Sequence, residues 1–333
     1  MDKSWSVGID VSQKWLDVCR SDSGEKPETC RFANTAQGHL ELVRWLRGRK
    51  ARVVVESTGR YSTDLVLALW KAPEVEVMVA NPHRVKEFRG AFFQRARTDR
   101  TSAEILAEYA VRMPFVPWNP PSRRALELRE LMRRVEALTE MATQEKNRLH
   151  AELASREHSR VVCEDLRRHV HHLQGRIRAL RRQALKLVEQ DPILKRAYHH
   201  LCSVRGIASL TALKLLGELL VLPEGLGVRQ WVAHAGLDPR PVQSGSSVDR
   251  PVHISRMGNV HLRRALFLPA LVAMRHDPHV RAFAEHLRSR GKKPMVVVVA
   301  VMRKLLHAIY GMLRTDTDFI GEKFFRMTTL AAA

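Results

Sequence analysis

Residues 51–56 read Ala-Arg-Val-Val-Val-Glu, a run of β-branched side chains that ends in an acid. Such an uninterrupted apolar run predicts a strand buried on both faces. Residues 4–11 read Ser-Trp-Ser-Val-Gly-Ile-Asp-Val and alternate between apolar and other side chains, which predicts a second strand that also carries an acid near its end. The acids Asp10 and Glu56 therefore stand at the ends of two expected strands.

Around these two strands, the pattern predicts an α/β domain over residues 1–118. Short β-prone runs separated by turn-forming residues predict strands at 15–19, 30–33 and 76–80. Helical spacing predicts helices at 38–47 and 61–71, and further helices that end before Pro114. The order is three strands, helix, strand, helix, strand, helix. A run of prolines marks the exit from this domain.

Residues 119–198 form a different kind of region, with apolar side chains in steps of four and three. The clearest seam consists of Leu166, Val170, Leu173, Ile177, Leu180, Ala184 and Leu187. It predicts two long coiled-coil helices, joined near residues 155–163, that fold back on each other or pair between subunits. The first segment, residues 131–149, also fits an ordinary amphipathic helix.

Residues 199–333 predict a mainly helical third domain. Ser203-Val204-Arg205-Gly206-Ile207-Ala208 lies between two helical stretches, as in a helix-hairpin-helix element or a simple helix–helix turn. A short helix at 228–235 is followed by a Gly/Pro/Ser-rich loop at 236–247. Longer helices are expected at 260–274 and 295–313.

The charge of the chain points to a polyanionic partner. Its 333 residues carry 56 Lys and Arg against 35 Asp and Glu, a formal net charge of +21. Nucleic acid is the first candidate partner and an anionic membrane the second. The longest apolar run, Met295–Met302, is too short to span a bilayer, and the narrow heptad seam suits a helix partner better than a membrane surface. Four widely spaced cysteines argue against a disulfide framework, so we expect a soluble cytoplasmic protein.

Two groups of residues are candidates for chemistry. Asp10, Glu56 and Asp99 offer carboxylate oxygens, which hard divalent cations prefer, although each acid alone could be a helix cap. Ser244 lies in a Gly-Ser-rich loop with arginines nearby that could hold phosphate oxygens. A serine hydroxyl needs help to act as a nucleophile, and such loops are most often only flexible connections.

Several ordered motifs together resemble the DEDD transposases of bacterial insertion sequences, the IS-one-ten family, which are related to the Piv/MooV invertases. The N-terminal motifs are Gly8-Ile9-Asp10-Val11-Ser12, Val55-Glu56-Ser57-Thr58-Gly59-Arg60-Tyr61, Asn81-Pro82 and Thr98-Asp99-Arg100. The C-terminal motifs are Arg205-Gly206-Ile207, Ala235-Gly236-Leu237-Asp238-Pro239, Gln243-Ser244-Gly245, Gly258-Asn259, Leu262-Arg263-Arg264 and Arg303-Lys304-Leu305-Leu306. The resemblance covers almost the whole chain.

This resemblance implies a RuvC-like domain of the ribonuclease-H type, a coiled coil, and a transposase domain with a catalytic serine at Ser244. It also implies that Asp10, Glu56 and Asp99 bind Mg²⁺. The family's fourth acid falls on Ser102, whose neutral hydroxyl is a poorer ligand. This difference has three interpretations: natural variation with a weaker site, an engineered change that cripples cleavage, or a water that fills the gap.

The implied activity is DNA recombination guided by a bridge RNA, with a phosphoserine intermediate. Its partners would be target DNA, donor DNA, the structured RNA and further copies of the chain in a dimer or tetramer, with no membrane; the protein would associate with the bacterial nucleoid when bound to DNA. Phosphate contacts are expected from Arg84, Lys86, Arg95, Arg97, Arg100, Arg205, Arg240, Arg256, Arg263 and Arg264. The alternatives are a RuvC-like nuclease that uses water, or a catalytically weakened nucleic-acid-binding relative.

Overall fold

A computed structural model describes residues 4–22, 26–56, 59–92, 98–244 and 248–327. The chain forms two units, Met1–Pro120 and Pro121–Ala333. The boundary falls in the expected run of prolines. The long helices and the C-terminal helices belong to one unit, because they share a core where the long helices meet the rest of that unit. The sequence pattern instead predicted a domain boundary between them, at 198/199.

The first unit is built on a five-stranded sheet with the order β3-β2-β1-β4-β5. Its strands are β1 (Trp5–Val11), β2 (Trp15–Ser21), β3 (Glu28–Ala33), β4 (Ala51–Glu56) and β5 (Val75–Ala80). Strands β1, β4 and β5 are parallel neighbours, and β2 pairs antiparallel with both β1 and β3. The five strands lie where the sequence predicts them, within two residues at either end.

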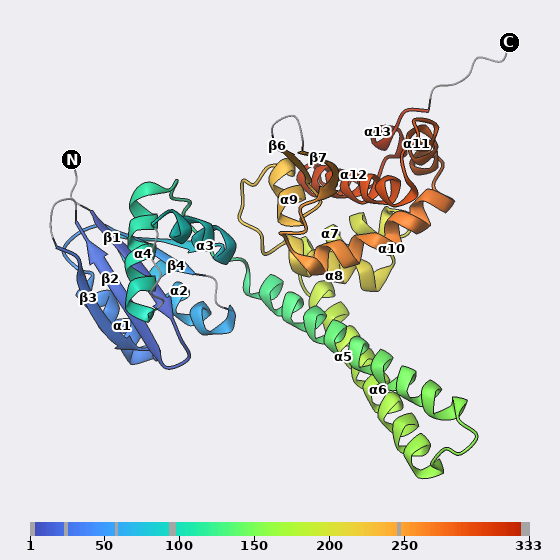
Figure 1. Cartoon of the computed structure of the whole chain (residues 1–333), viewed down its shortest axis with the longest axis horizontal. Coiled ribbons are helices and arrows are strands. Elements are labelled where there is room, and N and C mark those ends of the chain that lie inside the picture. Colours follow the sequence, from blue (N-terminus) through green and yellow to red (C-terminus); the bar gives the residue numbers. More distant parts are fainter. Residues whose placement is uncertain (1–3, 23–25, 57–58, 93–97, 245–247, 328–333) are drawn as a thin grey trace. The chain divides into compact units, whose positions relative to one another are not determined.

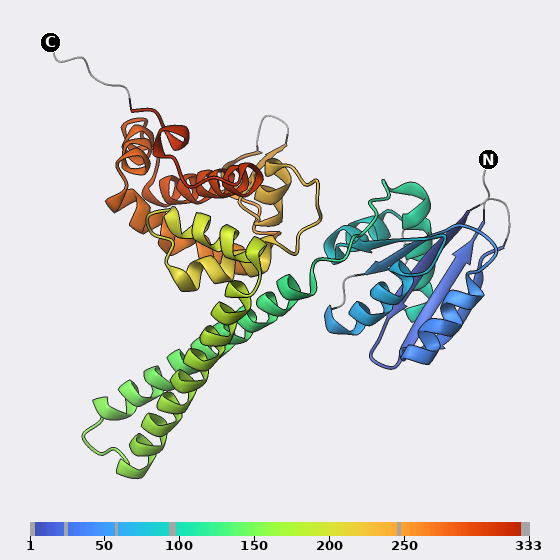
Figure 2. The same ribbon diagram turned by 180° about the vertical axis from the view of Figure 1, so that it is seen from behind.

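Helices cover both faces of this sheet (Figures 1 and 2). The core on one face joins Val7, Ile9, Val53 and Val55 to α1 (Ala36–Trp45) and α2 (Thr63–Trp70). The short 3₁₀ helix η1 (Gly59–Ser62) precedes α2. On the other face lie α3 (Pro82–Ala91) and α4 (Asp99–Arg112), and α4 packs on β1, β2 and β4.

The second unit begins with a helical hairpin made of α5 (Arg123–Ala154) and α6 (Arg160–Glu189). The two helices fold back on each other within one chain and pack through Leu138 and Ala142 of the first segment and Leu173 of the expected seam. Near its base the hairpin enters the large core of this unit through Leu128, Val135, Ala184 and Val188.

The remaining elements surround that core. They are α7 (Pro192–Ser203), α8 (Ser209–Leu219), α9 (Val228–His234), β6 (Pro239–Ser244), β7 (Val248–Ile254), α10 (Val260–His276), α11 (Pro278–Ser289), α12 (Pro294–Thr315) and α13 (Gly321–Phe324). Among the described residues, α12 is long and apolar enough to cross a membrane, which the run 295–302 alone did not suggest. Buried core helices pass the same test, and Val297, Val301, Leu305 and Ile309 are fully buried against the other helices.

Candidate functional site

Charged side chains form a row across the sheet of the first unit, on the face that α4 covers. Alternation along β1 places Val7 and Ile9 in the core below α1 and α2, so Gly8 and Asp10 face the opposite way. The parallel register pairs Ile9 with Val55, so Asp10 and Glu56 occupy the next positions of adjacent strands. On the other side, Asp10 pairs with Asp17 of β2, and Asp17 pairs with Arg31 of β3.

Helix α4 brings Asp99 to this row because Gly8 lets the helix approach the strand. A Cβ at Gly8 would lie 2.1 Å from the carbonyl oxygen of Ala103 and 2.2 Å from the backbone nitrogen of Ala107. The side chain of Thr98 caps α4 by accepting a hydrogen bond from the backbone N–H of Thr101 at 3.2 Å. Asp99 is thus the first helical residue and not the cap, and its carboxylate is left available for other partners.

The carboxylates repel one another in a partly buried place. Burial raises the pKa of Asp10 to about 6, helped by the negative charges of Asp99, Glu56 and Asp17. Burial also raises the pKa of Glu56, while the positive charge of Arg89 opposes that rise. A bound cation would offset this repulsion between Asp10 and the neighbouring carboxylates.

The donor set has the chemistry of a site for a hard divalent cation, because three carboxylates come from two strand ends and one helix start. In the part of the chain that the structure describes, no three His, Cys, Asp or Glu side chains lie close enough together to enclose a metal ion. Cation binding at Asp10, Glu56 and Asp99 would therefore require these side chains to turn toward a common point.

Ser102, one turn into α4, already has a partner. Arg89 of α3 donates a hydrogen bond from Nη2 to its Oγ at 3.0 Å. The Nε of Arg89 is buried, and no hydrogen-bond partner is found for it among the described residues. The position where the resemblance expects a fourth acid thus holds a neutral hydroxyl, which is hydrogen-bonded to the guanidinium group of Arg89.

Ser244 ends a strand, which corrects the expectation of an irregular loop at 236–247. Strands β6 and β7 form a two-stranded antiparallel sheet in which Ser244 pairs with Val248. The sequence obscured this sheet because Pro239, Pro241 and Pro251 interrupt its β-prone residues, a pattern tolerated only at unpaired strand positions or bulges. Its register shifts between Arg240 and Val242. Residues 245–247 lie outside the described residues.

The base of this β-hairpin is clamped by close backbone contacts. Gly236 has a φ of +63°, and a Cβ at Gly258 would lie 2.1 Å from the carbonyl oxygen of His234. Arg263 donates from Nη1 to the carbonyl oxygens of Ala235 at 2.9 Å and Gly258 at 3.2 Å. The motifs at 235–239 and 258–259 therefore hold the strands that lead to Ser244.

Asn259 joins this base to the helical core. Its side chain caps α10, accepting from His261 at 2.9 Å, and donates to Oε2 of Glu218 at 2.6 Å. Glu218 on α8 also accepts two hydrogen bonds from Arg133 of α5, at 2.7 and 2.9 Å. Burial opposes ionisation of Glu218, but the bonds from Arg133 and Asn259 outweigh it and lower the pKa of Glu218.

Comparison with known proteins places these features in a family. A DEDD transposase model of the IS110 type matches residues 7–156, and a model described as Transposase IS116/IS110/IS902 family matches residues 198–285. A transposase, y4rJ of Sinorhizobium fredii, is 30% identical over 365 residues, covering 91% of this chain and 90% of the relative. The chain belongs to the IS110 family of DEDD transposases.

Other relatives of this IS110-family chain are DNA-inverting proteins. The pilin gene-inverting proteins of Moraxella bovis and Moraxella lacunata are each 27% identical, over 326 and 329 residues, and cover 96% of this chain and 98% of their own length. Both the transposase and the invertase relatives thus align along nearly the whole of the chain.

The basic residues expected to contact phosphate fall into three groups in this IS110-family transposase. Some have protein partners: Arg100 pairs with Glu104 at 3.2 Å, Arg264 with Glu140 at 2.6 Å, and Arg205 donates to the carbonyl oxygen of His276 at 3.0 Å. Arg263 holds the hairpin base, as described above. Arg84, Lys86, Arg240 and Arg256 are exposed, and Arg240 directs its Nη1 to Sδ of Met257 at 3.7 Å, while Arg95 and Arg97 lie outside the described residues.

Sequence reasoning missed Asp17, Arg31 and Arg89. Arg31 donates from Nε to Asp17 at 2.9 Å, and its Nη2 lies 4.0 Å from Oδ2 of Asp99. The alternation of β2 could have placed Asp17 on the face of Asp10, since both strands were predicted. Nothing in the sequence pointed to Arg89, because its contact with Ser102 depends on the packing of α3 on α4.

Proposed function

We propose that this protein is an RNA-guided DNA recombinase of an insertion sequence that cuts and rejoins DNA through a covalent bond to Ser244. The order of its strands, with three parallel strands and an antiparallel pair at one edge, supports a RuvC-like first unit of the ribonuclease-H type. The single observation that carries the proposal is that Asp10 lies near enough to both Glu56 and Asp99 for their negative charges to help raise its pKa, in a chain of the IS110 family.

In the proposed reaction, the hydroxyl oxygen of Ser244 attacks a phosphodiester phosphorus. A bond from Oγ to phosphorus forms and a bond from phosphorus to a sugar oxygen breaks. The sugar oxygen leaves with the electron pair and takes up a proton, and the hydroxyl proton passes to a base. The reverse attack by the hydroxyl of another DNA end rejoins the strands and frees the serine. A phosphoserine bond conserves the energy of the phosphodiester, so no nucleotide cofactor is needed.

The acidic row, which consists of Asp10, Asp17, Glu56 and Asp99, would serve this reaction by holding Mg²⁺ at Asp10, Glu56 and Asp99. Such a cation would stabilise the negative charge that develops on the phosphate oxygens. Arg89 keeps a positive charge beside Glu56, and Arg31 neutralises Asp17, so both arginines limit the repulsion within the row. Ser102 adds no charge to this set.

The excess of positive charge supports binding of several nucleic-acid segments at once. A net charge of +21 suits a chain that holds structured RNA together with target and donor DNA. In this proposal the RNA selects the DNA by base pairing, the protein contacts backbone and shape, and copies of the chain assemble as a dimer or tetramer in the bacterial cytoplasm.

A covalent-adduct assay tests the proposal. The protein is expressed with the non-coding DNA that flanks its gene, the RNA that co-purifies is sequenced, and labelled DNA matching that RNA is offered with Mg²⁺. Ser244→Ala should abolish a denaturant-resistant protein–DNA adduct, while Ser246→Ala should retain it. Asp10→Asn should lose cleavage and still bind RNA.

The same assay distinguishes the competing functions. Strand breaks without any adduct, lost in Asp10→Asn but kept in Ser244→Ala, would identify a water-using nuclease instead. Tight, salt-dependent binding with no strand breakage in any divalent metal would identify a binding protein. An adduct that persists in Ser244→Ala would move the nucleophile to another residue.

A further inference from the structure

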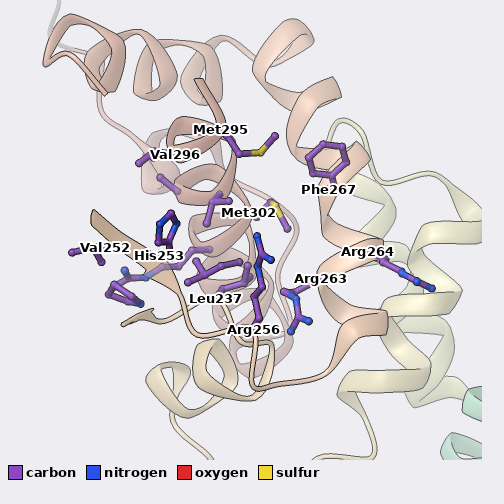
Figure 3. Close-up of a pocket in the computed structure, with 15 residues that line it drawn as sticks. Leu237, Val252, His253, Arg256, Arg263, Arg264, Phe267, Met295, Val296 and Met302 are labelled. Atoms are coloured by element: carbon purple, nitrogen blue, oxygen red, sulfur yellow. The ribbon is translucent and has the colours of Figure 1, made fainter. Parts of the chain in front are cut away.

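A cavity of about 530 Å³ lies in the second unit, next to the base of the β-hairpin formed by β6 and β7, whose first strand ends at Ser244. Side chains from β7, α10 and α12 line it, together with residues near the hairpin base (Figure 3). Its size falls in the range of roughly 300–1,000 Å³ that small-molecule and cofactor sites occupy. The clamps at Gly236, Gly258 and Arg263 fix one wall of this cavity.

Most of the lining is apolar, and part of it is exposed. Phe267 of α10 lines the cavity with Leu237 and Met302, while Met295 and Val296 at the start of α12 are 59% and 48% exposed. Val252 of β7 is 55% exposed at the same cavity. Apolar side chains gathered at the mouth of a concave site mark a place for an apolar group of a ligand.

Arginines border the apolar lining. Arg264 turns to Glu140 and Arg263 to backbone carbonyl groups, so both have partners. Arg256 and Arg303 are exposed, and neither has an ion pair with a carboxylate among the described residues. Arg256 also has a φ of +54°, a conformation that is uncommon for a non-glycine residue and that clusters at ligand sites.

We propose that this cavity binds one unpaired DNA nucleotide close to the strand that Ser244 cuts, with its base on the apolar lining and its phosphate against Arg256 and Arg303. The inference rests on the proposed function, because it takes DNA as the substrate. A base has apolar faces and stacks on aromatic rings such as Phe267. A phosphate group can serve as the negatively charged partner of the two arginines. A base must leave the duplex to enter a concave site of this size.

The site differs from a surface that merely attracts DNA. A purely electrostatic contact would need only the arginines and would not leave Met295, Val296 and Val252 exposed around a hollow. The combination predicts a preference for an extruded base over a paired one, which charge alone does not produce.

A binding experiment on the full-length protein tests this preference. The probes are a fluorescently labelled DNA duplex of about 24 base pairs, the same duplex with one bulged thymidine, and an RNA duplex with one bulged uridine. The bulged DNA should bind about tenfold more tightly than the paired DNA, as stacking of one base allows. Val296→Trp, which fills the cavity from an exposed position, should remove this preference and leave binding of the paired duplex unchanged.

Control variants show whether the cavity itself is responsible. Ile193→Trp places the same ring at a 67% exposed position on α7, away from the cavity, and should keep the tenfold preference. Arg256→Gln should weaken all probes and reduce the dependence of log affinity on log salt by about one. Equal binding of bulged and paired DNA by the unmodified protein, or a preference limited to the RNA bulge, would overturn the proposal.

Photocrosslinking locates the nucleotide directly. With 5-iododeoxyuridine at the bulge, irradiation should link the DNA to peptides that contain Phe267 or Met295, and Val296→Trp should suppress that link. Crosslinks confined to the first unit would overturn the assignment. These readouts involve binding alone, so loss of the Ser244 adduct and loss of the bulge preference are separate outcomes.

Discussion

The two regions that carry the candidate chemistry are built in opposite ways. The acids of the first unit come from strand ends and a helix start whose positions are determined by the packing of α4 on β1. Ser244 ends a strand of an isolated two-stranded sheet, which is marginally stable by itself. Its support comes from hydrogen bonds and close backbone contacts at the base of the hairpin, contributed by α9, α10 and the loops between them.

This difference teaches where each site is vulnerable. The acidic row depends on one close helix–strand contact, so a small steric change there should affect the whole first unit. The hairpin depends on polar groups such as Asn259, Arg263 and Asp238, which accepts from Ser255 Oγ at 2.5 Å. Damage to those groups should alter the position of Ser244 before it unfolds the second unit.

The largest effect is expected from Gly8→Ala, which tests the steric dependence of the acidic row. The new Cβ would meet backbone atoms of α4 at 2.1 and 2.2 Å, so the helix must move away from β1. We expect a loss of about 3 kcal/mol or more in the free energy of unfolding of the first unit. Urea unfolding followed by circular dichroism measures it. Gly90→Ala in α3, where a Cβ meets no neighbouring atom within 4 Å, should be neutral or stabilising.

Glu218→Ala tests the polar support of the hairpin base. The change leaves Asn259 and Arg133 without their shared acceptor, and we expect the second unit to lose about 2–3 kcal/mol of stability. The value stays below that of a fully buried pair because the Arg133 side chain is 46% exposed. The exposed Glu224→Ala serves as control. A variant as stable as the unmodified protein would show that the base does not depend on this network.

Ser102→Asp sharpens the comparison by adding a charge to the acidic row. An additional carboxylate should raise the affinity for Mn²⁺, used as a probe for Mg²⁺, by about tenfold, although Arg89 competes for the new charge. Isothermal titration calorimetry measures the change, and Ser102→Asn provides a neutral control of similar size. If no cation binds to either protein near pH 7, the metal assignment of Asp10, Glu56 and Asp99 is wrong.

The smallest effect is expected from weakening a pH-dependent ion pair between His200 of α7 and the aspartates that follow α12. Burial lowers the pKa of His200, but hydrogen bonds with Asp318 at 2.7 Å and Asp316 at 3.0 Å outweigh burial and raise it above 6.5. Because the folded pKa is raised, this stability is full below pH 6.5 and is lost as pH rises through the folded pKa. Both aspartates are exposed, so Asp318→Asn should cost only about 0.5–1 kcal/mol at pH 5.5 and almost nothing at pH 9.

Thermal unfolding at the two pH values checks this last expectation. Glu285→Gln removes one negative charge from an exposed position on α11, as Asp318→Asn does after α12, and should shift the melting temperature equally at both pH values. A larger loss at pH 9 than at pH 5.5 would contradict a raised pKa for His200 in the folded protein.

Much of the first unit could be predicted from local sequence, because its strands are apolar runs bounded by turn residues. The positions of Asp10 and Glu56 at neighbouring strand ends followed from that pattern, and the register places them side by side. The β-hairpin at 239–254 could not be recognised, because proline-interrupted strands carry a weak local signal. The partner of Ser102 was equally hidden, since Arg89 reaches it only through tertiary packing.

The heptad seam was predictable, but its use was not. Spacing alone left open whether the helices pair within or between chains, and the short connection at 155–159 decides for pairing within the chain. The base of the α5–α6 helical hairpin packs against the C-terminal helices through Leu128 and Val188. The burial of these two residues depends on contacts with residues far along the chain.

The way in which the helical hairpin returns to its starting point has a consequence for how such proteins vary in length. Arg124 donates to the carbonyl oxygen of Gln190 at 2.8 Å, so the chain leaves and re-enters the core at nearly one place. Everything beyond Leu138 on the outgoing arm can thus be shortened or extended by matched heptads without disturbing that junction. The arm thus has the construction of a spacer, whose length can change while its junction with the core stays the same.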